Sequence, residues 1–327
     1  MKPLWRSLGI LAALVGATAI VGPYALSEYQ LQVLVQMLAV ACIASAWNLM
    51  GGFTGLFSLG HITFVGLGAY VSTLLQVRSG LSPWLGLPLA MLLSGALAAV
   101  VGLVSYRSRL SHAALALLTM VLAQLAFVLA FSLDITQGMR GISIPLRPGL
   151  TQMQFATGRG YLLLALSMVA AIVGLCILIR HSKFGHRLIA LRENERVAEA
   201  IGIPTFRYKL MVTIISGALS APGGVLVAQY TLFVDPDSAF SIFKSLEIPI
   251  YAMVGGLGSA FGPLIGAVLM STIIQLLRPV LSDFGAGLDQ VVFGAALILV
   301  VLLAPRGITG YTAALLRRWK PRHEAVA

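Results

Sequence analysis

Apolar stretches about as long as a bilayer is thick recur along most of this chain. They cover residues 31–50, 61–77, 84–106, 112–133, 160–179 and 210–232, and further apolar runs follow at 245–277 and 288–304. A helix needs about 20 mainly apolar residues to cross a bilayer, where every backbone polar group must be bonded internally. Charged residues make up only 10% of the chain, against roughly 25% in soluble domains. The sequence therefore predicts an all-α, polytopic transmembrane helical bundle.

The first segment has two interpretations. Lys2 and Arg6 precede an apolar run that ends at Ala17, Thr18 and Ala19, a small-x-small pattern typical of a signal-peptide cleavage site. Segment 1–22 is thus either cleaved or retained as the first span. We favour retention, because the apolar character continues past the cleavage pattern.

The distribution of positive charge decides the number of spans. The run 245–277 is interrupted by glycines and is long enough for one span or two. Lys and Arg near span ends stay in the cytoplasm, and only two spans there, the first of them short, leave the C-terminal cluster on that side. That cluster is Arg306, Arg317, Arg318, Lys320 and Arg322. We expect about ten spans, with both the N- and C-termini cytoplasmic.

Composition argues against several other kinds of protein. The net charge of +11 comes from basic residues at span ends rather than on one aromatic-studded face, so nucleic acid is not an expected partner. Cys42 and Cys176 both lie inside apolar segments, which favours small buried hydrophobes over a disulfide or metal site. No His, Asp, Glu or Cys cluster has the spacing of metal ligands or of a catalytic triad. We therefore expect neither an enzyme nor a metal or cofactor in this chain.

A charged segment at residues 180–209 lies between two apolar stretches. It reads RHSKFGHRLIALRENERVAEAIGIPTFRYK, with seven Lys or Arg residues and three Glu residues. We call it the charged loop and expect it in the cytoplasm.

The charged loop carries helix signals. Phe184, Leu188 and Leu191 share one helical face, and Asn194 is placed to cap a second short helix that carries Val197, Ala198 and Ile201 and is stopped by Gly202 and Pro204. These signals predict a pair of short helices along the membrane surface. They serve either to fix topology or to dock a cytoplasmic partner that grips the apolar stripe.

Two segments break the apolar pattern with glycine clusters. The first is Asn48–His61, NLMGGFTGLFSLGH, and the second is Val254–Gly266, VGGLGSAFGPLIG. Glycine lowers helix stability by about 1 kcal/mol per interior position relative to alanine, so such clusters are expected to end or unwind helices. Two interpretations are open. The segments either line a translocation path, as interrupted spans do in transporters, or form tight cytoplasmic turns between close-packed helices.

Polar side chains inside apolar runs are costly and usually face the bundle interior or a pathway. They are Gln36, Asn48, Ser58, His61, Gln124, Gln229, Glu247 and Gln275. Each also has a simpler interpretation as a helix-to-helix hydrogen bond, and Glu247, near a span end, as a residue in contact with water.

Three blocks of the sequence resemble one protein family, and they occur in the family's order. They are NLMGGFTGLFSLGHITFVGLGAY at 48–70, FGHRLIALRENERVAEAIGIPTFRYKLMVTIISGALSAPGGVLVA at 184–228 and SLEIPIYAMVGGLGSAFGPLIGAVL at 245–269. The chain is similar to the permease subunits of branched-chain amino acid ABC importers of the bacterial inner membrane, of the LivM type. The resemblance implies one permease domain over residues 1–327.

The resemblance also implies partners. Such permeases work as a heterodimer of two permease subunits with two cytoplasmic ATPases and a periplasmic solute-binding protein. The chain has no G-x-x-x-x-G-K-[ST] phosphate-binding loop, so ATP would be bound by the partners.

Two groups of site residues follow from the resemblance. The expected ATPase-coupling residues are Phe184, Gly185, Arg187, Leu188, Leu191, Arg192, Glu195, Arg196, Glu199 and Gly202. The expected translocation-path residues are Asn48, Gly52, Ser58, His61, Gln124, Gly255 and Gly256.

One loop departs from the family pattern and leaves the solute open. Residues 134–145 read DITQGMRGISIP, where LivM-type relatives carry a Gly-Gly-Thr-Asp-Gly-like run. Similar permeases handle urea, amides or other amino acids, which is the first alternative. The second is a secondary transporter or channel that needs no ATPase, for which Glu247 and His61 are the ionisable residues near the spans.

Overall fold

The computed structural model describes residues 2–281, 294 and 307–311, and that part of the protein is almost entirely helical. Its α-helices are α1 (Lys2–Ala25), α2 (Glu28–Thr54), α3 (Ile62–Ser79), α4 (Pro83–Arg107), α5 (His112–Ser132), α6 (Gly158–His181), α7 (Lys183–Glu193), α8 (Glu195–Ala200), α9 (Thr205–Thr231), α10 (Pro236–Phe240), α11 (Ile242–Gly255) and α12 (Gly262–Leu281). Short 3₁₀ turns η1 (Asp134–Thr136), η2 (Gly138–Arg140) and η3 (Leu150–Gln152) lie between α5 and α6. The predicted all-α class is confirmed.

Six helices in the described part are long and apolar enough to cross a membrane. They are Leu4–Ala25, Glu28–Thr54, Pro83–Arg107, His112–Ser132, Gly158–His181 and Thr205–Thr231. The chain is therefore a multi-pass membrane protein. The predicted last span at 288–304, apart from Gly294, and the C-terminal basic cluster lie outside the described residues.

Helix α2 lies at the centre of the bundle. In its most apolar stretch 78% of the residues are buried, against 22% for α5 at the periphery. Ala41, Ala44 and Ala46 are fully buried, and such small side chains let membrane helices approach closely. Helices α6, α9, α11 and α12 all pack against α2. Whatever contacts α2 is thus in contact with the core of the bundle.

The apolar run at 245–277, for which we expect two spans, forms two helices. The short α11 ends at Gly255, α12 begins at Gly262, and the two pack against each other. A side chain at Gly255 would collide with the Gly262 carbonyl oxygen, so the pair is packed backbone to backbone. This tight hairpin agrees with the interpretation of Val254–Gly266 as a turn between close-packed helices.

The expectation that both glycine clusters interrupt helices needs a correction in the first cluster. Helix α2 continues through Gly51 and Gly52 and ends only at Thr54, followed by Gly55 in the left-handed conformation with φ 73°. The missing side chains of Gly51 and Gly52 leave space for close neighbours: the Trp47 ring packs over Gly51, and the Gly258 backbone approaches Gly52. Only residues 55–61 of this segment are non-helical.

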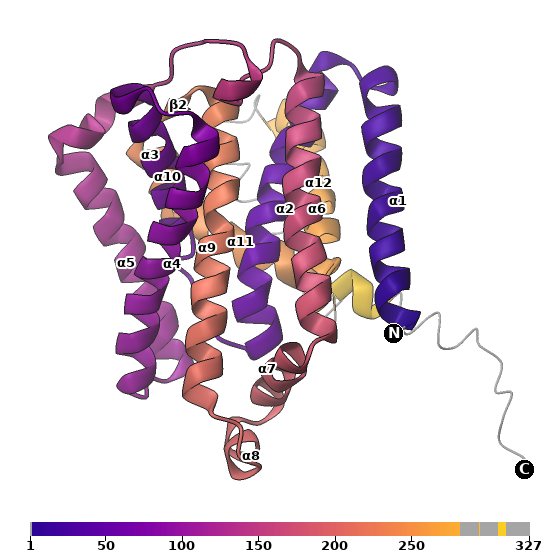
Figure 1. The fold of residues 1–327 in the computed structure, drawn as a ribbon, viewed down its shortest axis with the longest axis vertical. Helices are drawn as coiled ribbons and strands as arrows, with labels where there is room; N and C mark the ends of the chain where they lie inside the picture. Colours follow the sequence, from indigo (N-terminus) through magenta and orange to yellow (C-terminus); the bar gives the residue numbers. More distant parts are fainter. Residues whose placement is uncertain (1, 282–293, 295–306, 312–327) are drawn as a thin grey trace, which may run out of the picture.

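The two ends of the bundle differ in what they carry. Helices α7 and α8 lie at one end, where α1 also begins, and β2 lies at the opposite end (Figure 1). At that opposite end β1 (Ile142–Ser143) pairs with β2 (Phe233–Val234), which ties the 134–145 loop to the segment after α9. The charged loop and the start of the chain are thus on the same side of the bundle.

Candidate functional site

The charged loop folds into the two short helices that its sequence predicts. The Ser182 hydroxyl accepts a hydrogen bond from the Gly185 amide at 3.1 Å and caps α7. The Asn194 side chain accepts one from the Val197 amide at 3.2 Å and caps α8. Gly202 follows α8 with φ 84°, which ends the helix as expected.

The apolar side of α7 faces the protein's own bundle. Leu188 and Leu191 are buried in the main hydrophobic core, and α7 packs against α2, α6 and α9. The half-buried Phe184 packs its ring against Tyr208, with ring centroids 5.4 Å apart. The apolar stripe that the sequence offered to a partner is therefore covered by this chain, and it attaches α7 firmly to the bundle.

The exposed side of α8 offers a different surface. Val197 and Ile201 are 55% and 69% exposed, and Arg196 is exposed beside them, whereas Ala198 is buried. We call Arg196, Val197 and Ile201 the α8 tip. Two exposed aliphatic side chains four residues apart, with a cation next to the first of them, form a surface that a partner protein can bind.

Several predicted coupling residues hold α7 and α8 against α9. Glu195 forms an ion pair with Lys209, and the Glu199 carboxylate accepts a hydrogen bond from the Thr205 hydroxyl at 2.6 Å. Arg187 donates to the Tyr208 hydroxyl. Glu195 and Glu199 thus join α8 to α9, and Arg187 joins α7 to α9.

Arg192 connects the charged loop to the first glycine segment. Its Nη1 donates a hydrogen bond to the Gly52 carbonyl at 2.9 Å, near the end of α2. Its Nη2 lies 2.7 Å from the Glu193 carboxylate. From the end of α6, Arg180 donates to the Gly258 carbonyl in the second glycine segment. The two arginines join the end of α6 and the charged loop to both segments.

Asn48 joins the two glycine segments directly. Its Nδ2 donates to the Ser259 carbonyl at 2.9 Å, and its Oδ1 accepts from the Gly258 amide at 3.0 Å. Gly258 has φ 72°, a left-handed conformation that glycine adopts readily. We call Asn48, Gly52, Gly258, Arg180 and Arg192 the glycine junction.

Two other predicted path residues form a separate buried cluster. His61 Nε2 lies 2.7 Å from the Ser220 hydroxyl of α9, and the Trp47 indole donates to the Ser58 carbonyl at 2.8 Å. The described residues provide no hydrogen-bond partner for His61 Nδ1. This cluster joins the start of α3 to α2 and α9, which fits a packing role for His61.

The remaining predicted path residues are not brought together. Gln124 is exposed on the peripheral α5. Gly255 and Gly256 form the turn of the α11–α12 hairpin, next to Gly258 of the glycine junction. Among the described residues, none of the seven predicted path residues lines the main cavity.

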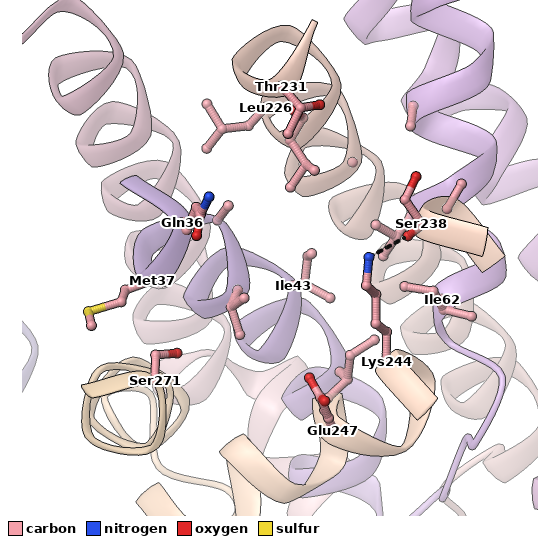
Figure 2. A pocket seen from close by; sticks show the side chains of 18 of the residues that line it. Gln36, Met37, Ile43, Ile62, Leu226, Thr231, Ser238, Lys244, Glu247 and Ser271 are labelled. Atoms are coloured by element: carbon pink, nitrogen blue, oxygen red, sulfur yellow. Dashed lines mark hydrogen bonds between the residues drawn. The ribbon is translucent and has the colours of Figure 1, made fainter. Parts of the chain in front are cut away.

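That cavity lies among α2, α3, α9, α10, α11 and α12 and has a volume of about 770 Å³. Figure 2 shows Lys244 and Glu247 reaching toward it from α11, with Gln36 and Ile43 on α2 and Ser271 on α12. Gln36, Glu247 and Gln275, which also line it, stand out in the sequence as polar residues in apolar runs. Lys244 was missed as a lining residue, because it appears in the sequence only as a charge at a span end.

The cavity and the glycine junction lie one after the other along α2. The cavity is lined by the first half of α2, up to Ile43. Asn48 of the junction follows about 7 Å further along the helix axis, toward α7. The cavity thus lies in the half of the bundle away from the charged loop. The hydrogen bonds of the glycine junction lie in the half next to the charged loop.

No group of three or more His, Cys, Asp or Glu side chains within residues 2–281, 294 and 307–311 is arranged to hold a metal ion.

Comparison with known proteins gives a consistent set of similarities. The family model described as branched-chain amino acid transport system / permease component matches residues 29–301. The high-affinity branched-chain amino acid transport system permease protein LivM of Salmonella typhimurium is 27% identical over 331 residues, covering 94% of this chain and 76% of LivM. The high-affinity branched-chain amino acid transport system permease protein LivH of the same organism is 27% identical over 289 residues, covering 83% of this chain and 91% of LivH. Ribose import permease protein RbsC of Bacillus subtilis is 32% identical over 158 residues, 45% of this chain and 47% of RbsC. No solved structure matches.

Proposed function

Because this chain belongs to the permease component family of branched-chain amino acid transport systems, we propose that it is the membrane permease subunit of an ATP-driven ABC importer for branched-chain or related amino acids. It transports these amino acids and has no ATPase activity of its own. One observation carries the proposal: Arg192 of the surface helix pair and Arg180 at the end of α6 are hydrogen-bonded to the two glycine segments of the bundle. That arrangement suits a subunit whose movement is driven from outside the membrane.

The partners and topology follow from this proposal. Two cytoplasmic ATPases bind and hydrolyse ATP, a second permease completes a heterodimer, and a periplasmic binding protein delivers the solute. The chain forms one permease domain over residues 1–327 in the bacterial inner membrane, with about ten spans and both termini in the cytoplasm. The position of α1's start at the same end as α7 and α8 supports this orientation (Figure 1).

The contacts of the charged loop suggest how force reaches the pathway. An ATPase that binds the α8 tip would move α8 and, with it, α7, which α8 directly follows and packs against. Arg192 then transmits the displacement to Gly52, and Asn48 carries it on to Gly258. Both glycine segments therefore move together, which is what alternate opening of a pathway to the two sides requires.

The test is whether the α8 tip binds the ATPase. In the double variant Arg196→Glu, Val197→Asp, co-purification of the ATPase subunits and ATP-dependent leucine uptake in proteoliposomes should both be lost. Both positions are exposed, so the permease itself should still fold. Arg140→Glu, the same Arg-to-Glu reversal placed in the exposed η2 turn of the 134–145 loop, is the control and should leave co-purification intact.

Two results would overturn the proposal. One is undiminished ATPase binding and uptake in the double variant. The other is leucine uptake by the purified chain alone, driven by a proton or sodium gradient, which would make it a secondary transporter.

A further inference from the structure

The main cavity is lined mostly by apolar side chains, together with a few polar and charged ones. Most lining residues are aliphatic, including Val40, Ile43, Ile62, Leu226 and Ile248. Its volume of about 770 Å³ is within the range of roughly 300–1,000 Å³ typical of small-molecule sites. An aliphatic cavity of this size suits a ligand with an apolar portion.

Two opposite charges line the same cavity from one helix. Lys244 and Glu247 are three residues apart on α11 and so lie on the same side of the helix. The Lys244 ammonium donates to the Ser238 carbonyl at 3.1 Å (Figure 2). The Glu247 carboxylate accepts from the Tyr251 hydroxyl at 3.1 Å. Charged groups among membrane helices are costly and are usually retained for a functional partner.

From this arrangement we infer that the permease itself contains a selective site for a zwitterionic α-amino acid with an aliphatic side chain. Lys244 binds the ligand's carboxylate, Glu247 binds its ammonium group, and the aliphatic wall receives the side chain. The inference rests on the proposed function and narrows it, because a neutral solute such as urea leaves both charges without a counter-charge in the ligand. Discrimination would then occur in the membrane as well as in the binding protein.

The location of the site fits a transport cycle. The cavity lies in the half of α2 away from the charged loop, and the Asn48 bonds to Gly258 and Ser259 cross the bundle just beyond its inner end. A bound amino acid would therefore lie next to the glycine segment that Arg192 connects to α7, on the side away from the charged loop.

The experiment measures ligand binding to the purified complex of both permeases and the ATPases, without the binding protein. Thermal unfolding is followed with L-leucine, with leucinamide, which lacks the carboxylate, with 4-methyl-2-oxopentanoate, which lacks the ammonium group, and with urea. L-Leucine should stabilise the complex most. In both Lys244→Met and Glu247→Gln, the leucine concentration for half-maximal stabilisation should rise about tenfold or more, since each variant removes one charged contact.

The effect of each variant on each ligand shows which group of the ligand that charged residue binds. Lys244→Met should weaken the binding of the oxo acid but not of leucinamide, and Glu247→Gln should do the reverse. Arg147→Met removes an exposed cation from the loop between α5 and α6, outside the cavity lining, and should change none of these values.

Failure of this inference can be told apart from failure of the proposed function. Unchanged leucine binding in both variants, or stabilisation by urea in place of leucine, overturns the zwitterion site. ATPase subunits that still co-purify with the variants keep the proposed function intact in either case.

Discussion

Gly52 allows two segments far apart in the sequence to approach closely. A Cβ atom built on Gly52 would lie 2.7 Å from the Gly258 amide nitrogen and closer still to Asn48 Oδ1. Real Cβ atoms do not approach backbone so closely, so any larger residue here must separate the segments or displace Asn48. The absence of a side chain at position 52 is therefore part of the glycine junction.

We expect Gly52→Ala to destabilise the protein by about 1–3 kcal/mol, the usual cost of overpacking a filled interior. The thermal midpoint of the detergent-solubilised protein measures this. Gly16→Ala is the matched control, because its Cβ would have nothing within 4 Å on the same kind of helical backbone. It should be neutral or stabilising by up to about 1 kcal/mol, the difference in helix propensity. Equal midpoints for the two variants would contradict the close approach at Gly52.

At the scale of elements, α7 is the part that touches both the surface and the interior. It is buried through Leu188 and Leu191, it continues into the exposed α8, and it reaches α2 through Arg192. A side-chain bond from a charged donor to a backbone carbonyl contributes about 1.5–3 kcal/mol. Among the described residues, Arg192 thus provides the hydrogen bond that links α7 to α2.

Arg192→Met should uncouple the transporter without unfolding it. We expect ATP-dependent leucine uptake to fall about tenfold, the effect of losing one such bond. Basal ATP hydrolysis and ATPase co-purification should remain, because the α8 tip is untouched. Glu193→Gln is the control: it removes the exposed ion pair with Arg192 but keeps the bond to Gly52, and exposed pairs contribute only about 0–1 kcal/mol. Uptake by Arg192→Met at the level of Glu193→Gln would show that the link carries no coupling.

Local elements were more predictable from the sequence than contacts between them. Asn194 and Gly202 carry the cap and the stop of α8 within a few residues, so the helix pair could be read directly. Arg192 and Gly52 are 140 positions apart, and nothing in the sequence gives the rotation of α7 that brings them together. Lys244 was missed for the same reason: a charge at a span end does not reveal a cavity until α2, α9 and α12 are placed beside it.

In the molecule as a whole, coupling to an ATPase requires the end of the bundle that carries the charged loop to face the cytoplasm. The charged loop lies at one end and the β1–β2 pair at the other (Figure 1). If the loop faced outward, no ATPase could reach the α8 tip. The two native cysteines, Cys42 and Cys176, are both buried, so an introduced cysteine can be labelled selectively.

Cysteine labelling in intact cells or spheroplasts therefore tests the orientation. Ile201 is 69% exposed on the α8 tip, and Leu146 is 66% exposed in the loop after β1 at the other end. A membrane-impermeant maleimide should label Leu146→Cys in intact spheroplasts, because the outer loops face the reagent directly. Ile201→Cys should be labelled only after permeabilisation, and the unsubstituted chain should stay unlabelled in both conditions. Labelling of Ile201→Cys before permeabilisation would place α7 and α8 outside the cell, and transmission of force through Arg192 from a cytoplasmic ATPase would then be impossible.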